Sequence, residues 1–188
     1  MSPMGPSPFD GAALKRVRGE AGLSLRELSL KAGVSASLLS QIERGVTQPS
    51  ISTLKRTAEA LGISIFLLMP SEDGPSAGMV VRASRRRRVV LEHENLKYEL
   101  LSPNARGKLE VWQGRLEPGA TSGSEPSTHP SEEFILVLSG EMQITIGATE
   151  HVLERGDSIQ YDGSQPHTIV ALGTNELRFI SALTPPTL

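Results

Sequence analysis

The sequence predicts an α+β protein of two domains, an all-α bundle of five helices followed by an antiparallel β barrel. Apolar residues recur at helical spacing as far as Met69, and at every second position from Tyr98 onward. Between these parts, the stretch S-E-D-G-P-S-A-G, Ser71–Gly78, has the glycine, proline and serine content of a linker. At 188 residues the chain is long enough for two small domains.

The domain boundaries follow from these changes in pattern. We expect a helical domain at residues 9–70, a linker at 71–79 and a β domain at 80–186. Charge is divided unevenly, because residues 1–70 carry eight Lys or Arg against five Asp or Glu, whereas 71–188 carry eleven against sixteen. The two halves are therefore expected to face different partners.

The composition limits the kinds of site that the chain can hold. Cysteine is absent, so a disulfide framework and a thiolate metal site are excluded, and any metal must be held by histidine, carboxylate or water. The N-terminus, M-S-P-M-G-P-S-P, has no apolar signal region, and the longest apolar run, Ile63–Met69, is too short to span a bilayer. We expect a cytoplasmic protein without a membrane partner.

Serine and glycine residues mark the boundaries of the predicted helices. Ser24 and Glu27 form a capping-box pattern, and Ser35 and Ser50 precede the next two helical runs. The glycines expected to close the successive helices are Gly22, Gly33, Gly45 and Gly62. The first helix should place Ala12, Ala13, Val17 and Ala21 on one face. The short apolar run at 64–69 is expected to add a fifth helix.

The second and third helices with the glycine-containing turn between them form a helix-turn-helix pattern. The stretch reads G-L-S-L-R-E-L-S-L-K-A-G-V-S-A-S-L-L-S-Q-I-E-R-G-V-T-Q-P-S-I-S-T-L. It closely resembles the lambda-repressor-like, or Cro-like, family of DNA-binding domains over Ala12–Met69. Family core and turn positions are matched by Leu28, Ala32, Val34, Leu39, Ile42, Gly45, Pro49 and Leu54. A five-helix protein-interaction module is the alternative, but the third helix carries small polar residues and not an apolar stripe.

The resemblance implies which residues contact DNA, because the third helix of this family enters the major groove. The residues expected to face bases are Ala36, Ser37 and Gln41, and those expected to face the backbone are Ser35, Ser40 and Arg44. Gln41 can form a bidentate pair with adenine, and Ala36 can touch a thymine methyl group. With few strong base contacts, readout of DNA shape should also contribute. Further phosphate candidates, or else ordinary surface charges, are Arg26, Lys55 and Arg56.

From Tyr98 onward, short alternating runs separated by turn signals are typical of a sandwich or barrel. Two stretches among them read P-G-A-T-S-G-S-E-P-S-T-H-P-S-E-E-F-I-L-V-L-S-G-E and R-G-D-S-I-Q-Y-D-G-S-Q-P-H-T-I-V. They resemble the two sequence motifs of the cupins, and the match spans about residues 80–184. The resemblance implies an antiparallel β barrel of the jelly-roll type.

The cupin motifs contain three candidate metal ligands. Positions 127, 129 and 133 share a parity on an extended chain and can face the interior together, while His167 comes from a strand across the cavity. His129, Glu133 and His167 supply two imidazoles and a carboxylate, which suits one divalent ion of Zn, Fe, Mn or Ni. However, Ser127 stands where metal-binding cupins usually carry their first histidine, and Ala171 replaces an asparagine often found in the second motif.

Two interpretations of this set stay open. Either the three residues bind a metal, or His129 and Glu133 hydrogen-bond each other and an effector in a metal-free cavity. The expected lining of that cavity is Ser127, His129, Glu133 and His167. His93 and His151 lie outside the motifs and are interpreted as surface strand residues. Arg85–Arg88 is expected at the edge of the first strand, with its guanidinium groups paired to carboxylates; a DNA or nuclear-import patch is the alternative.

Together, the two resemblances indicate the bacterial transcriptional regulators that join a Cro-like helix-turn-helix to a cupin sensor. The expected function is sequence-specific DNA-binding regulation by a homodimer on a palindromic operator, controlled by a small-molecule effector, without enzymatic activity. One alternative is a metal-dependent cupin oxygenase or isomerase with a DNA-binding head, which the missing first histidine disfavours. The other is an antitoxin-type protein whose cupin half binds a toxin.

Overall fold

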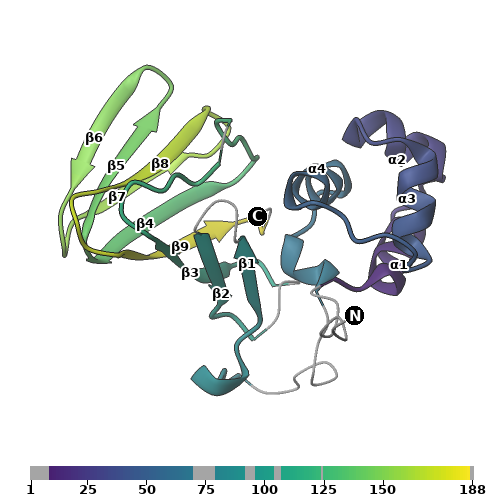
Figure 1. Ribbon diagram of the computed structural model, residues 1–188, viewed down its shortest axis with the longest axis horizontal. Coiled ribbons are helices and arrows are strands. Elements are labelled where there is room, and N and C mark those ends of the chain that lie inside the picture. The colour runs from purple at the N-terminus through teal and green to yellow at the C-terminus, as the bar shows by residue number, and fades with distance from the viewer. Residues whose placement is uncertain (1–8, 70–78, 92–95, 104–106, 124, 187–188) are drawn as a thin grey trace, which may run out of the picture. The chain divides into compact units, whose positions relative to one another are not determined.

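The structure of the protein is a computed structural model that describes residues 9–69, 79–91, 96–103, 107–123 and 125–186. The chain divides into two compact units, one built of helices and one built of strands (Figure 1). Among the described residues, no helix combines the length and the apolar character needed to cross a membrane. Nearly all of the predicted linker, together with His93, lies outside the described residues.

The described part of the helical unit contains four α-helices and a short 3₁₀ helix (Figure 1). These are α1 (Gly11–Glu20), α2 (Leu25–Ala32), α3 (Ala36–Glu43), α4 (Ile51–Leu61) and η1 (Ile65–Leu68). The prediction of five α-helices is therefore wrong at its last element. Ser64 caps η1, and Met69 is already extended at φ −92° and ψ 147°. The segment between them is too short to nucleate an α-helix.

The helix boundaries otherwise follow the predicted capping residues. Ser24 and Glu27 form a complete capping box, in which each side chain accepts a hydrogen bond from the other residue's backbone N–H. Ser35 and Ser50 cap α3 and α4 through their hydroxyl groups. Gly33 ends α2 in the left-handed conformation at φ 62°, which glycine adopts without steric cost.

The core of the helical unit contains the positions that the sequence marked. Buried among them are Leu28, Ala32, Val34, Leu39, Ile42 and Leu54. The predicted face of α1 is corrected, because Leu14 is buried while Ala12 and Ala21 are exposed. Arg18 then ties α1 to α3, since its Nε and Nη2 donate to the two carboxylate oxygens of Glu43 at 2.6 and 2.9 Å. This bidentate pair fixes the end of α3.

The β unit consists of two antiparallel sheets (Figure 1). Its strands are β1 (Arg88–Leu91), β2 (Leu96–Leu100), β3 (Glu110–Leu116), β4 (Glu132–Ser139), β5 (Glu141–Ile146), β6 (Thr149–Leu153), β7 (Ser158–Asp162), β8 (His167–Leu172) and β9 (Leu177–Thr184). A six-stranded sheet has the order β1-β2-β3-β9-β4-β7, and a three-stranded sheet has the order β6-β5-β8. A second 3₁₀ helix, η2 (Ala83–Arg85), precedes β1.

The predicted antiparallel architecture is present, but the predicted closed barrel is not formed by the described strands. Their ladders end at the edges of two separate sheets. The chain first passes from one sheet to the other at the tight turn between β4 and β5, where Gly140 has φ 78°. It changes sheet again on both sides of β7 and after β8. Within the part of the chain that the structure describes, only isolated bridges, Thr121 with Val170 and Ser127 with His167, add to the edge of β8.

Aromatic packing sets the register of the central strands of the six-stranded sheet. The ring of Trp112 packs edge-on against Tyr98 and Phe179, with centroids 4.5 and 5.6 Å away. Gly114 pairs with Phe179 across β3 and β9, and a Cβ at Gly114 would lie 2.3 Å from the Phe179 ring. The same register pairs Trp112 with Ser181, which places Ser181 in the interior.

The predicted pairing of the arginine run with acidic groups is confirmed for two of its members. β1 is an edge strand, and Arg86 and Arg88 contact the two oxygens of Glu99 at 3.2 and 3.1 Å. Arg115 of β3 approaches the same carboxylate at 3.7 Å. His151 is exposed on β6, as expected. These arginines therefore neutralise a largely buried acid on the sheet.

Candidate functional site

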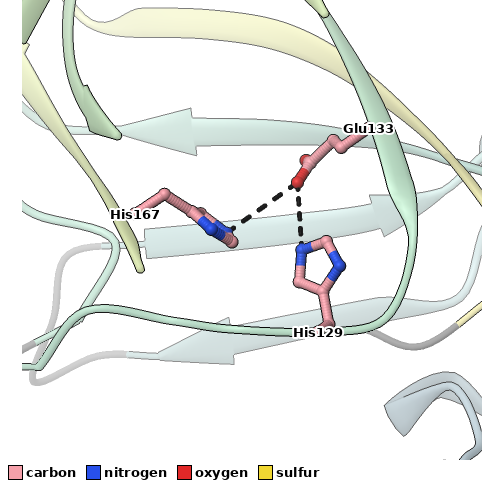
Figure 2. Close-up of side chains that lie close together, drawn as sticks. All are labelled: His129, Glu133 and His167. Atoms are coloured by element: carbon pink, nitrogen blue, oxygen red, sulfur yellow. Dashed lines mark hydrogen bonds and ion pairs between the residues drawn. The ribbon is translucent and has the colours of Figure 1, made fainter. Parts of the chain in front are cut away.

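The three predicted ligand residues of the β unit converge in its interior (Figure 2). His129 precedes β4, Glu133 lies on β4 and His167 begins β8. The Nε2 atoms of His129 and His167 lie 3.1 and 3.9 Å from Oε2 of Glu133. The two imidazole rings meet edge to face, with centroids 4.9 Å apart. The predicted convergence of these side chains from both sheets is thus confirmed.

Glu133 is the hydrogen-bonded centre of this cluster. Its side chain is 4% exposed, and it accepts hydrogen bonds from the Tyr161 hydroxyl at 2.7 Å and from the Ser181 hydroxyl. Burial by itself would raise the pKa of Glu133, but the hydrogen bonds from His129, Ser181 and Tyr161 together lower it. Glu133 is therefore an ionised carboxylate at neutral pH.

Tyr161 is held in its neutral, donating form. Burial, followed by the charge of Glu133, raises the pKa of Tyr161 far above the usual range. Its ring also packs edge-on against His167, with centroids 5.1 Å apart. Tyr161 thus anchors the carboxylate from β7 while it covers one imidazole.

The two histidines differ in how their second ring nitrogens are placed. Nδ1 of His167 lies 2.9 Å from the carbonyl oxygen of Gln165, so that nitrogen carries a proton, and Nε2 is the ring nitrogen that faces Glu133. Nδ1 of His129 is buried without a hydrogen-bond partner among the described residues. An Nε2 proton shared with Glu133 therefore accounts for the contact made by His129.

Gly163 holds His129 in place by its lack of a side chain. The His129 N–H donates to the Gly163 carbonyl at 2.8 Å, and the Gly163 N–H donates to the Ser131 carbonyl at 2.8 Å. A Cβ at position 163 would lie 2.2 Å from Cε1 of His129 and 2.4 Å from Nδ1. The turn before β8 thus packs directly on the imidazole.

Sequence reasoning missed Tyr161 and Ser181. Tyr161 is paired with Glu133 across β4 and β7, and Ser181 is paired with Ile135 across β4 and β9. Period-two alternation places both side chains on the buried face, but that signal does not say which strand lies beside β4. Ser127, predicted to line the cavity, is half-buried, and its backbone pairs with His167 by two hydrogen bonds of 2.8 and 2.9 Å.

The cluster fits a divalent cation in its donor types and its spacing. Two imidazole nitrogens and one carboxylate oxygen lie within 4.8 Å of one another, and all three residues are buried. His167 is already in the tautomer that a metal ligand needs, because Nδ1–H is held by a backbone carbonyl. The site can therefore hold a cation, or a small polar molecule that replaces the contacts within the cluster.

The predicted DNA-contacting residues lie on or beside α2, α3 and α4 (Figure 1). On α3, Ser37 is exposed, and Ala36, Ser40 and Gln41 are half-buried. Ser35 and Arg44 cap the two ends of this helix, and both are exposed. The Ser35 hydroxyl accepts a hydrogen bond from the Leu38 N–H, so its contact with a phosphate would use its donating hydrogen.

The remaining basic candidates differ in their surroundings. Arg26 on α2 is exposed, whereas Lys55 on α4 is half-buried. Arg56 is exposed, and its Nη1 donates to the Gly33 carbonyl at 3.3 Å, next to the turn of the helix-turn-helix. One further contact was not expected, because the Thr47 hydroxyl donates to Oε1 of Gln41 at 3.2 Å. No local sequence pattern marks that contact.

Comparisons with known proteins cover both halves of the chain. A helix-turn-helix family matches residues 14–68, and a cupin domain family matches residues 112–183. The HTH-type transcriptional regulator PuuR of Escherichia coli (strain K12) is 29% identical over 188 residues, covering 100% of both chains. The uncharacterized HTH-type transcriptional regulator y4dL of Sinorhizobium fredii is 31% identical over 156 residues, covering 77% of this chain and 71% of the relative. A crystal structure of a helix-turn-helix family transcriptional regulator from Vibrio cholerae matches with TM-score 0.73 and 29% identity, covering 94% of each chain.

Replacing Gly163 with alanine should displace His129, because the added methyl group overlaps the imidazole. We expect Gly163→Ala to lower the free energy of unfolding by about 1–3 kcal/mol, as is typical of overpacking. Chemical denaturation measures this loss, and histidine NMR signals report the displacement. Ser164→Ala, at the exposed neighbouring position, is the control; it removes only a hydroxyl that hydrogen-bonds Asp162, and it should leave the histidine signals unchanged and cost less stability. Equal stability of the two variants would contradict the assigned contact.

Proposed function

The chain belongs to the HTH-type transcriptional regulators that join an N-terminal helix-turn-helix domain to a C-terminal cupin domain, and we propose that its cupin domain senses a small-molecule effector. The observation that carries this proposal is the buried cluster of His129, Glu133 and His167. We retain domain boundaries at 9–70 and 80–186, with a linker at 71–79; the matched family segments fall inside the two domains. A DNA-bound regulator of this kind acts in the cytoplasm of a bacterium.

In the proposed DNA complex, α3 lies in the major groove of the operator. Gln41 reads adenine through both atoms of its amide, while Ala36 and Ser37 contact neighbouring base edges. Arg44, exposed at the C-terminal end of α3, contacts phosphate. The other proposed backbone contacts come from Arg26, Ser35, Ser40 and Lys55. Gln41 therefore contributes specificity, and Arg44 contributes affinity for any sequence.

Gln41→Ala should relax base preference, whereas Arg44→Ala should weaken binding to all sequences alike. The expected cost of the first variant is roughly 1–3 kcal/mol and is confined to sites with the preferred base. The second should also reduce the slope of log affinity against log salt by about one, because one phosphate contact is lost. Fluorescence anisotropy on selected and scrambled duplexes separates these effects. If each variant raises the dissociation constant by the same factor on the selected and the scrambled duplex, the roles of Gln41 and Arg44 are wrongly assigned.

The effector proposal rests on the cost of burying polar groups. Two imidazoles and a carboxylate removed from water are expensive unless each has a partner. Glu133 has its partners within the protein, but Nδ1 of His129 does not find one among the described residues. Because the Gly163 turn covers that side of the imidazole, a ligand with a polar group would bind between the two sheets on the Nε2 side, where it would replace contacts within the cluster. The relatives are named as transcriptional regulators, which favours sensing over catalysis.

If the sensor uses a metal, His129, Glu133 and His167 would hold it, and Zn, Fe, Mn or Ni would suit the donor set. Such an ion would supply a positive centre for anionic or lone-pair groups of the effector. If the sensor is metal-free, Tyr161 and Ser181 keep Glu133 in position, and the imidazoles bind the effector directly. The three residues line the effector cavity in either case, together with Ser127.

Elemental analysis of the purified full-length protein, combined with a thermal-shift screen, distinguishes the two cases. Stoichiometric metal that is lost in His129→Ala, but retained in His151→Ala, supports a metal-assisted sensor. His151 is the control because it is an exposed histidine on β6, away from the cluster. Metal-free protein that is stabilised by one metabolite supports direct effector binding.

A third outcome would remove the sensor function. If neither metals nor a broad set of metabolites shift the melting temperature, and Glu133→Gln leaves release from DNA unchanged, the cupin domain does not sense a ligand in this cavity. DNA binding by the helical domain would be unaffected by that result.

Dimer formation is proposed through the outer face of the six-stranded sheet. Phe134 points away from the buried cluster, and it is 39% exposed. In the strand register, Phe134 is paired with Ala182 on β9, and Leu136 is paired with Ile180. Ala182, Leu136 and Ile180 are half-buried. A second copy of the chain would cover this apolar surface and bring two helical domains to a palindrome with half-sites about 34–36 Å apart.

Charges on the same face favour a two-fold arrangement. Arg178 lies near one end of β9, and Glu132 lies at the opposite end of β4, beside Thr184 in the strand register. A two-fold axis running across the strands reverses these ends between copies, so that unlike charges approach. Glu133 and Phe134 are adjacent on β4, with opposite orientations. An effector that binds at Glu133 can therefore alter the dimer interface at Phe134. We expect a coupling free energy between effector binding and dimer formation of about 1–3 kcal/mol.

Phe134→Glu should convert the proposed dimer into a monomer, because it would bury two unpaired carboxylates at the interface. Sedimentation velocity measures the mass, and anisotropy measures the weaker DNA binding that should accompany it. Val152→Glu is the control, since Val152 is 57% exposed on the other sheet. A wild-type protein that is monomeric, both free and on DNA, would rule out the dimer.

A further inference from the structure

The segment after α3 folds back beside the proposed base-reading residue. Arg44 caps the helix and Gly45 adopts φ 69°, which reverses the chain. The Val46 N–H then donates to the Gln41 carbonyl at 2.9 Å. The next residue is Thr47, whose hydroxyl donates to Oε1 of the Gln41 side chain at 3.2 Å. The end of α3 thus places one polar side chain against another.

We propose that Thr47 is a positioning residue that fixes the amide plane of Gln41 and thereby sets its preference for adenine. This inference rests on the proposed role of Gln41. Adenine recognition uses both ends of the amide, because the Gln nitrogen donates to N7 and the Gln oxygen accepts from the N6 amino group. Both atoms must therefore face the base in one plane.

The contact with Thr47 is compatible with that pairing. A carbonyl oxygen has two lone pairs, so Oε1 of Gln41 can accept from Thr47 and still accept from adenine. Both hydrogens of Nε2 stay available for the base. A glutamine loses considerable side-chain entropy when it is fixed. Fixing the side chain before DNA arrives lowers the cost of binding, and it holds the amide plane in the orientation in which both of its ends can reach one base.

Neither residue is fully buried, so the pair remains accessible. Gln41 and Thr47 are both half-buried, while Arg44 and Gln48 beside them are exposed. A direct contact between Thr47 and a phosphate is the alternative to its positioning of Gln41. A phosphate contact would affect all sequences equally, whereas a positioning role changes base preference. The two roles can be separated experimentally.

The test uses the full-length protein and a randomised duplex library with a fixed length of about 20 base pairs, roughly two helical turns, to define the preferred half-site. Discrimination is then measured as the ratio of dissociation constants for duplexes that differ at the adenine read by Gln41. Gln41→Ala should reduce this ratio about 5- to 150-fold, the range expected for a bidentate pair. Thr47→Val, which keeps the side-chain shape and removes the hydroxyl, should reduce it about 2- to 10-fold.

Two further variants make the result specific. Thr47→Ser restores the hydroxyl and should keep the wild-type discrimination. In the Gln41→Ala background, Thr47→Val should cause no further loss, because its effect passes through the glutamine. Circular dichroism checks that each variant retains its helices.

Three outcomes would overturn the inference. In the first, Thr47→Val leaves the ratio unchanged; in the second, it weakens binding to every duplex by the same factor; in the third, it acts additively with Gln41→Ala. In the second case Thr47 contacts phosphate directly. If Gln41→Ala itself leaves the ratio unchanged, the proposed role of Gln41 fails first. Loss of discrimination in Gln41→Ala without any change in Thr47→Val leaves the proposed function intact and removes only the role of Thr47.

Discussion

The buried carboxylate of Glu133 is the constraint on which the interior of the β unit depends. A charge that is removed from water must be paired or hydrogen-bonded, and here the donors come from separate strands. Tyr161 of β7 and Ser181 of β9 each donate to one of its oxygens, and His129 approaches from the segment before β4. A shift of one residue in either neighbouring strand would turn its donor to the opposite face. The polar cluster therefore reinforces the register that apolar packing also favours.

The aromatic core is the apolar part of the same constraint. Phe179 occupies the space that a side chain at Gly114 would need, so β3 and β9 can pair closely in only one register. That register carries Ser181 to the interior, two residues along β9 from Phe179. Gly163 has a comparable role in the turn before β8, where the absence of a side chain leaves room for His129. Site geometry thus depends on two glycines that make no chemical contact with a ligand.

The helical unit is under a different constraint, because it must hold a short helix rigidly while the outer face of that helix stays polar. An isolated eight-residue helix such as α3 would be unstable in water. Its apolar face is buried through Leu39 and Ile42, and the bidentate pair between Arg18 and Glu43 fixes its last turn. Stability of α3 therefore comes from residues that point away from its polar face, which leaves that face available for DNA.

Local interactions made much of this architecture predictable from the sequence alone. The Ser24 and Glu27 capping box, and the end of α2 at Gly33, depend on hydrogen bonds and backbone preferences within a few residues. Periodicity likewise identified the buried positions of α2 and α3, such as Leu28 and Leu39. The motif spacing identified His129, Glu133 and His167 as a group. Two imidazoles and a carboxylate are donor types that a divalent metal accepts.

Only the tertiary structure determined which distant residues meet. Tyr161 and Ser181 are 28 and 48 residues from Glu133 in sequence, and alternation specifies a face of a strand but not its neighbours. The same limitation explains why the sequence predicted a closed barrel where two sheets form, since strand order depends on the balance of all pairings at once. It also explains the 3₁₀ conformation of η1, because an apolar run fixes burial without fixing the hydrogen-bond pattern. Thr47 meets Gln41 only through the chain reversal after α3, which is a geometric result and not a pattern of residue types.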